Sequence, residues 1–136
     1  MAKKKGITSK AKKKEAVANA VLTKGKGNIR INKKKLSIIE PEYIQEFIKE
    51  PLELAGDIVN NMDISVIVKG GGVVSQAVAA RAAIAKVILI ELKNDENLKK
   101  KFLAYDRMLL VDDSRRVEPK KQLGPKARAK KQASKR

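Results

Sequence analysis

The pattern of apolar and polar residues is clearest in the middle of the chain, where an alternating run leads into a long helical pattern. Over residues 64–69 apolar side chains alternate with mostly polar ones, which predicts a strand with at least one buried face. The glycines at 70–72 predict a tight turn, because glycine adopts positive φ angles and lets another backbone approach closely. Ser75 is a suitable N-cap for the helix that the spacing of small and apolar residues predicts over 76–92.

Shorter strands are predicted before this region. Residues 17–23 have an apolar strand pattern, the segment 24–28 has glycine-rich turn chemistry, and residues 29–31 alternate, which together predict a β-hairpin. Residues 32–35 form a second, lysine-rich turn. This turn is either an exposed loop or a direct contact with a phosphate backbone.

Two short helices are expected between the hairpin and the central strand. Pro41 suits the first turn of a helix, Pro51 is expected to end it, and residues 52–59 would form the second helix. The rings of Tyr43 and Phe47 share a helical face with apolar neighbours. We therefore interpret both rings as core residues and not as a platform for stacking bases.

The elements after the long helix are short and end in a polar tail. Residues 96–105 predict a surface helix with a lysine-rich outer face, and the apolar run 108–111 can form a last strand. Asp112 and Asp113 are interpreted as local turn and capping residues. The order of elements predicts an α+β fold with helices on one face of a small mixed sheet. The chain is expected to consist of a basic N-terminal extension that is mobile without a partner (1–14), a globular body (15–114) and an extended basic C-terminal tail (115–136).

The positive charge is concentrated at the two ends of the chain. The formal net charge is +17, but residues 1–14 carry seven lysines and no acid, and residues 115–136 carry ten Lys or Arg and the single acid Glu118. A near-neutral body with two basic ends is typical of a protein that binds a polyanion, although a lysine run can also be a solvated tail. Within the long helix, Arg81 and Lys86 interrupt the apolar surface and are expected to face solvent or a partner.

The missing residue types narrow the function. The sequence has no cysteine and no histidine, which excludes disulfides, thiolate chemistry and His-dependent nucleophiles. We therefore expect a protein that is not an enzyme and has no cofactor or metal. No apolar run approaches the ~18 to 20 residues of a membrane span, and the lysine-rich N-terminus lacks the apolar core of a signal peptide. A cytoplasmic protein with no membrane partner is expected.

The glycine turn does not match a nucleotide-binding motif. A Walker loop needs Gly-Lys followed by Ser or Thr, whereas here Lys69 precedes the glycines. A dinucleotide fingerprint needs a third, spaced glycine where this chain has Ser75. The turn can still present backbone N–H groups of a helix N-terminus to a phosphate of a large nucleic acid.

Three ordered sets of residues carry a family resemblance, and together they cover nearly everything from about residue 15 onward. They are Glu50-Pro51-Leu52-Glu53-Leu54, then Val68-Lys69-Gly70-Gly71-Gly72 with Gln76, Ala77 and Arg81, and then 112–121 followed by a tail that closes in Ser134-Lys135-Arg136. With these motifs the chain resembles the ninth protein of the small ribosomal subunit, the universal S-nine family, in its archaeal or eukaryotic form.

The resemblance implies a fold, a function and partners. The fold would be a two-layer β-α-β domain like the second domain of ribosomal protein S-five. The protein would be a structural constituent of the small ribosomal subunit, bound to ribosomal RNA and to neighbouring proteins in the head of the subunit, and not an isolated homo-oligomer. Its tail would reach the anticodon stem-loop of peptidyl-site transfer RNA through Lys135 and Arg136. The competing class is a sequence-independent DNA-compacting protein, which would also be small and lysine-rich.

Charge, turn chemistry and this resemblance together predict the residues that bind ribosomal RNA. They are the cations and turn glycines Lys12, Lys13, Lys14, Lys33, Lys34, Lys69, Gly70, Gly71, Gly72, Arg81, Arg115, Arg116, Lys120, Lys121, Lys126, Arg128, Lys130 and Lys131. The family usually begins its first strand after Gly-Arg-Arg-Lys-Thr, whereas the matching residues 12–16 here are Lys-Lys-Lys-Glu-Ala. Lysine keeps the charge of arginine but lacks its bidentate fork.

Overall fold

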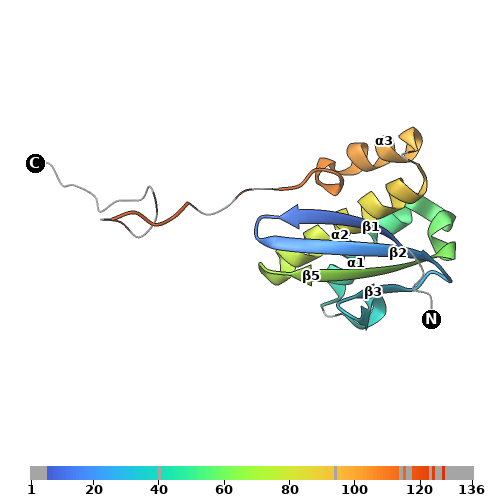
Figure 1. Cartoon of the computed structure of the whole chain (residues 1–136), viewed down its shortest axis with the longest axis horizontal. Helices are drawn as coiled ribbons and strands as arrows, with labels where there is room; N and C mark the ends of the chain where they lie inside the picture. The colour runs from blue at the N-terminus through green and yellow to red at the C-terminus, as the bar shows by residue number, and fades with distance from the viewer. Residues whose placement is uncertain are drawn as a thin grey trace, which may run out of the picture.

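A mixed five-stranded sheet with helices packed on one of its faces forms the body of the protein (Figure 1). The computed structural model describes residues 6–39, 41–93, 95–113, 115, 118–122, 124 and 127. The strand order is β1-β2-β5-β3-β4, with β3 and β5 parallel and the other neighbouring pairs antiparallel. The strands are β1 (Ile7–Lys13), β2 (Ala16–Lys24), β3 (Ile29–Ile31), β4 (Lys34–Lys35) and β5 (Met62–Lys69). The helices are α1 (Glu42–Ala55), α2 (Val73–Glu91) and α3 (Glu96–Tyr105), with 3-10 turns η1 (Leu36–Ile38), η2 (Gly56–Asn61) and η3 (Arg107–Leu109). The predicted α+β fold class is confirmed.

The central strand β5 follows the predicted alternation. Ile64, Val66 and Val68 point into the core under the helices, while Ser65, Ile67 and Lys69 are exposed. Because β5 pairs with β2 on one side and β3 on the other, it organises the sheet.

The predicted hairpin of residues 17–31 is wrong, because β5 lies between β2 and β3. The segment 24–28 instead carries the chain around the end of β5, where the amides of Lys26 and Asn28 donate to the Asp63 carboxylate at 3.0 Å each. Turn chemistry is local, so it did not reveal that a distant strand would insert between the two runs. The predicted lysine-rich turn is confirmed at Asn32 and Lys33, which connect β3 to β4, whereas Lys34 and Lys35 form β4.

The N-terminal extension is also shorter than expected. Ile7–Lys13 form the edge strand β1, paired along its length with β2. Ala11 is fully buried, and the Ser9 hydroxyl donates to the Ala83 carbonyl of α2 at 2.7 Å. The alternating lysines hid this strand, because lysine on an edge strand is usual and contributes no apolar signal.

The helix α1 continues through Pro51 to Ala55, so the two predicted short helices are one helix followed by the turn η2. Proline removes one N–H donor but can be tolerated when packing compensates, and Pro51 is fully buried. The helix ends at Gly56, which has φ +73°. Tyr43 is 61% exposed, so its assignment to the core is wrong, whereas Phe47 is partly buried against the core.

The helix α2 is the core helix of the body. It begins at Val73 with Gly72 at the N-cap position, so Ser75 lies inside the helix and not at its start as predicted. Its many alanines allow close packing on β1, β2 and α1. By length and composition α2 could cross a membrane, contrary to the expectation that no run approaches such a length. Its burial in the sheet and helix layers identifies it as the core helix of a folded domain.

The predicted surface helix at 96–105 is confirmed as α3, with Leu98 and Phe102 buried and Asp95 accepting a hydrogen bond from the Asn97 amide. The apolar run after it, residues 108–111, is not a strand, because its first half lies in the 3-10 turn η3 and the rest is a turn and a bend. The Asp106 carboxylate accepts the Met108 amide at 2.9 Å and starts this turn.

Candidate nucleic-acid interface

Three turns that carry predicted RNA-binding residues meet at one end of the sheet, although the β1–β2 turn itself was not predicted. In the β1–β2 pair Lys13 lies opposite Ala16, and in the β2–β5 pair Val17 lies opposite Lys69. The β1–β2 turn and the glycine turn after β5 therefore lie at the same end of the sheet. Because β3 is parallel to β5, its turn at Lys33 also lies at this end. We call this surface the basic end; its residues are Lys12, Lys13, Lys14, Lys33, Lys34, Lys69, Gly70, Gly71 and Gly72.

Backbone geometry joins the glycine turn to the β1–β2 turn. Gly70 has φ +79°, and a Cβ atom built on it would lie 2.5 Å from the carbonyl oxygen of Glu15. Gly71 has φ +68° and lies against the backbone and side chain of Ala16. Glycine is therefore favoured at both positions, because a side chain at Gly70 would clash with the Glu15 backbone and one at Gly71 would press against Ala16. Gly72 has open space around it and a φ of −91°.

The side of the Lys33 turn that faces β5 is fixed by Asn32. The backbone N–H of Asn32 donates to the Val66 carbonyl, and its side-chain Oδ1 accepts a hydrogen bond from the backbone N–H of Val68, both at 2.8 Å. Asn32 and Lys33 both have positive φ, as a two-residue hairpin turn requires. Lys33 and Lys34 are consequently held in the exposed turn beside the end of β5.

The basic end presents cations and helix amides together. Lys14, Lys33, Lys34 and Lys69 are exposed. The first turn of α2, all of whose residues are described, carries neither an acidic residue nor a capping side chain. The N-terminal end of a helix carries a partial positive charge, so α2 adds to the potential of the lysines. Such a surface attracts phosphate groups.

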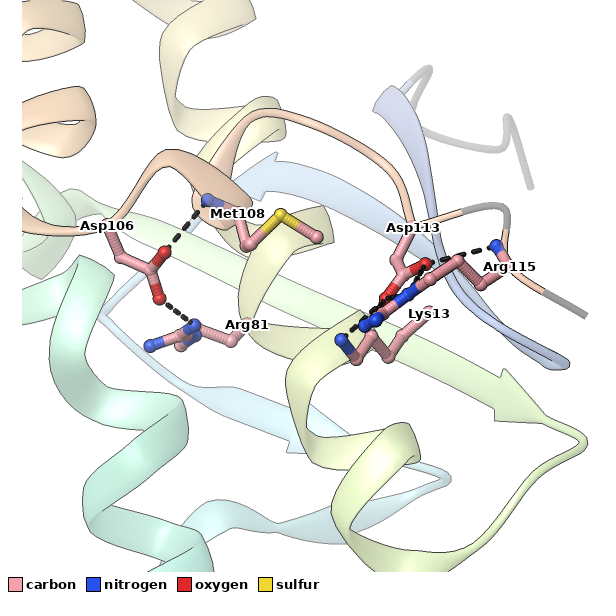
Figure 2. Close-up of polar contacts among 6 residues, drawn as sticks. All are labelled: Lys13, Arg81, Asp106, Met108, Asp113 and Arg115. Carbon is pink, nitrogen blue, oxygen red and sulfur yellow. Dashed lines mark hydrogen bonds and ion pairs between the residues drawn. The ribbon is translucent and has the colours of Figure 1, made fainter.

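Lys13 and Arg115 are held by a carboxylate at this end. Lys13 Nζ lies 2.7 Å from Asp113, and the guanidinium of Arg115 donates to both Asp113 oxygens (Figure 2). Hydrogen bonds from Arg115 and then from Lys13 hold the pKa of Asp113 far below its usual range. The interpretation of Asp112 and Asp113 as merely local turn residues is therefore wrong, since both join segments about a hundred residues apart.

Arg81 lies away from the basic end and its side chain is buried, so the prediction that it faces solvent or a partner is wrong. Its side chain is 4% exposed and forms ion pairs with Glu50 of α1 and with Asp106, the latter at 2.6 Å (Figure 2). Its guanidinium also lies 4.1 Å from the centre of the Phe47 ring. Burial opposes ionisation of Asp106, but the Met108 amide and Arg81 together hold its pKa below the usual value. Arg81 therefore joins α1, α2 and the segment after α3.

The other face of the sheet, which no described element covers, carries two cations that the predicted set missed. Lys10 and Arg30 are exposed there, and Lys12 and Lys69 lie in one cross-strand row on either side of Val17. Asp63 lies on the same face, but backbone amides led by that of Asn28 lower its pKa and engage its carboxylate. Strand alternation around Lys10 would have placed it outward if β1 had been recognised.

The tail carries the remaining predicted residues. Lys120 and Lys121 are described and exposed. The other predicted residues of the tail lie outside the described residues: Arg116, Lys126, Arg128, Lys130, Lys131, Lys135 and Arg136.

A sheet end with exposed lysines and glycine amides is typical of the class of small basic proteins that bind polyanions. A family model for ribosomal protein S9/S16 matches residues 11–136. The small ribosomal subunit protein uS9 of Methanococcus vannielii is 49% identical over 131 residues, which cover 93% of this chain and 97% of that protein. The protein of the same name from Methanococcus maripaludis is 47% identical over the same shares of each chain.

The chain therefore belongs to the ribosomal protein S9 family. It is a structural, non-enzymatic protein of the small subunit of the cytoplasmic ribosome, and it acts in translation. The resemblance predicted from the sequence is confirmed, and membership in this family decides against a DNA-compacting protein.

Proposed function

We propose that the chain binds small-subunit ribosomal RNA through its basic end, in the head of the subunit beside other head proteins, and that its C-terminal tail reaches transfer RNA in the peptidyl site. The observation that supports the RNA contact is the convergence of the β1–β2 turn, the β3–β4 turn and the glycine turn at one end of the sheet. Figure 1 shows that the tail leaves the body on the side of the β1–β2 turn. One RNA surface can thus engage both the basic end and the start of the tail.

The chemistry of this end favours contacts with the RNA backbone. Lysine ammonium groups act as point charges toward phosphates, and the glycine turn leaves room for a phosphate to approach the backbone. The segments that form the basic end contain no aromatic residue, so base stacking contributes nothing there. Phosphate contacts position a protein on RNA without reading its sequence. The fold of the RNA would therefore determine where the chain binds.

The tail would continue the same contact toward the transfer RNA. Lys120, Lys121, Lys126, Arg128, Lys130 and Lys131 would neutralise ribosomal RNA phosphates along the route. The segment after Asp113 has about 23 residues and can span up to roughly 75 Å when fully extended, at ~3.3 Å per residue. Lys135 and Arg136 would contact transfer RNA, with Arg136 the better phosphate ligand because its planar fork donates two hydrogen bonds at once.

Matched neutralisations test the RNA contact of the basic end. The triple variant Lys14→Gln, Lys33→Gln and Lys69→Gln removes three exposed charges there, and Lys99→Gln, Lys100→Gln and Lys101→Gln removes three exposed charges from α3. Binding of the full chain to a small-subunit ribosomal RNA transcript is measured by filter binding at several salt concentrations. The slope of log affinity on log salt should become shallower by about 2 to 3 for the first variant, at ~0.7 to 0.9 per phosphate. Equal changes in both variants would contradict a specific role for the basic end.

Truncations test the contact of the tail. Deletion of Ser134–Arg136 should leave assembly of the chain into small subunits intact and weaken peptidyl-site transfer RNA binding by about 1 to 3 kcal/mol, the scale of a charge-assisted hydrogen bond. Arg136→Ala should reproduce most of this loss, whereas deletion from Gly124 onward should impair both assembly and binding. The measurement is filter binding of transfer RNA to purified subunits that carry each variant. Unchanged affinity in all three would reject the proposed transfer RNA contact.

A further inference from the structure

The start of the tail is fastened to the edge strand of the sheet at Asp113. The Asp113 amide donates to the Lys12 carbonyl at 3.0 Å, and the Lys14 amide donates to the Asp113 carbonyl at 2.7 Å. These two bonds make a parallel bridge between Asp113 and Lys13, beside the end of β1. A residue bonded through both its amide and its carbonyl is fixed in position and in chain direction.

The Asp113 side chain strengthens this attachment. It is 3% exposed and accepts hydrogen bonds from Lys13 Nζ at 2.7 Å, from the Arg115 amide at 3.0 Å and from the Arg115 guanidinium at 2.7–3.1 Å (Figure 2). One partner lies on β1 and the other two belong to the first residues of the tail. The carboxylate therefore links the edge of the sheet to the segment that leaves it.

Asp112 adds a second attachment next to the first. Its carboxylate pairs with Lys86 of α2 and accepts the Lys12 amide at 3.3 Å. Lys86 Nζ also donates to the Lys10 carbonyl at 3.2 Å. Asp112 and Asp113 thus attach the chain to β1 and α2, and Arg115 is bound to Asp113. We call these three residues the tail anchor.

We propose that Asp113 is a positioning residue, which fixes the direction in which the C-terminal tail leaves the body and so strengthens the contact between the end of the tail and transfer RNA. This inference rests on the proposed transfer RNA contact. Length alone cannot give a large effect. If the anchor opened back to Leu109, the tether would grow from about 23 to about 27 residues, and the effective concentration of its end would fall by only about a fifth, as the −3/2 power of length.

Direction is therefore the main contribution of the anchor. A tether that starts in a fixed direction samples a cone, whereas a freely jointed start samples all orientations that the body leaves open. We expect loss of the anchor to weaken transfer RNA binding by roughly 3-fold to 10-fold, which is larger than the length effect and overlaps the lower end of the range expected for loss of the terminal contact.

Spin labels can report the direction of the tail, because the chain has no native cysteine. One label is placed at Lys120→Cys in the tail and the other at Asn19→Cys on the uncovered face of β2, both exposed positions. Electron–electron double resonance on the full chain should give a narrower distance distribution with native Asp113 than with Asp113→Asn. Asp57→Asn, which neutralises an exposed carboxylate on η2, is the matched control and should leave the distribution unchanged.

A second variant protects the test against a general loss of folding. Lys13→Met removes one partner of the carboxylate but leaves the charged contact with Arg115, so it should also broaden the distribution, by a smaller amount than Asp113→Asn. Thermal unfolding of each variant is recorded first, and distances are compared only below the start of unfolding. Identical distributions for native Asp113, Asp113→Asn and Lys13→Met would overturn the proposal.

Transfer RNA binding to subunits that carry the variants completes the test. A broader distribution together with 3-fold to 10-fold weaker binding in Asp113→Asn would support the proposal. If deletion of Ser134–Arg136 weakens binding but Asp113→Asn does not, the positioning role is overturned while the transfer RNA contact stands. If the deletion also has no effect, the proposed transfer RNA contact fails, and with it the claim that the anchor serves that contact.

Discussion

Replacement of Arg81 separates a structural role from an RNA-binding role for this residue. Arg81→Met keeps most of the side-chain volume but removes the charge that pairs with Glu50 and Asp106. Loss of one partner from a fully buried ion pair costs about 3 to 5 kcal/mol, because the remaining charge is left without compensation. Here the carboxylates of Glu50 and Asp106 are 23% and 35% exposed, so water can partly replace the guanidinium.

Two further observations set the size of the effect. The guanidinium contact with Phe47 adds roughly 0.5 to 2 kcal/mol that a methionine would only partly replace. Against this, Arg81 Nε is buried without a hydrogen-bond partner within the described residues, so the native side chain carries an uncompensated desolvation cost. We therefore expect Arg81→Met to lower the free energy of unfolding by about 2 to 3 kcal/mol.

Urea unfolding and RNA binding are measured on the same variant. At a typical urea dependence of ~1 to 3 kcal/mol per molar, the midpoint should fall by roughly 0.7 to 3 M. Adding Glu50→Gln and Asp106→Asn should recover part of the loss, because the carboxylates are then no longer left without a cation. The salt slope of RNA binding should not change. If the salt slope became shallower by about 0.7 to 0.9 while the stability stayed native, Arg81 would bind a phosphate and would not have the structural role proposed for it.

Two other predictions follow from the glycine turn and the carboxylates. Gly70→Ala should destabilise the chain by about 1 to 3 kcal/mol in urea unfolding, because φ is +79° and the new Cβ would meet the Glu15 carbonyl. The control Gly72→Ala should cost under about 0.5 kcal/mol, because that position has open space. Equal losses in the two variants would contradict the close approach of Gly70 to Glu15. The pKa values of Asp63, Asp106 and Asp113 are lowered in the folded chain, so the unfolded chain binds protons first as pH falls. Thermal stability should therefore be retained above about pH 4 and fall below it, less steeply in Asp113→Asn. An unchanged pH profile in that variant would contradict an ionised, buried Asp113 carboxylate.

The parts of the fold that the sequence predicted well are those with a strong local pattern. The alternation of β5 and the helical spacing of α2 and α3 each come from a continuous run of apolar residues. The positive φ angles of Gly70 and Gly71 were also predictable, because three glycines between a strand and a helix leave few alternatives.

The errors come from non-local packing. A proline ends an isolated helix, but burial of Pro51 against the core compensates for the missing donor and α1 continues. The pairing of β2 and β3 with β5 depends on contacts between residues 35 to 52 positions apart, which turn chemistry cannot reveal. Strand β1 was missed because its outward lysines resemble a solvated tail.

The candidate site was predicted in its residue types but not in its arrangement. Exposed lysines beside turn glycines are visible in the sequence, and the register of the strands then brings the turns together. Arg81 and Lys13 have the same charge as the exposed cations, but each pairs with a carboxylate far away in the sequence. A charge alone does not tell whether its partner is a phosphate or an acidic residue of the same chain.

A side-chain-resolution map of the small subunit that carries this chain, with transfer RNA in the peptidyl site, tests the central claim most directly. We expect ribosomal RNA phosphates within hydrogen-bond distance, about 3 Å, of Lys14, Lys33 and Lys69, and Arg136 beside the anticodon stem-loop. A map in which the basic end faces solvent or another protein, and in which the tail ends away from the transfer RNA, would contradict it.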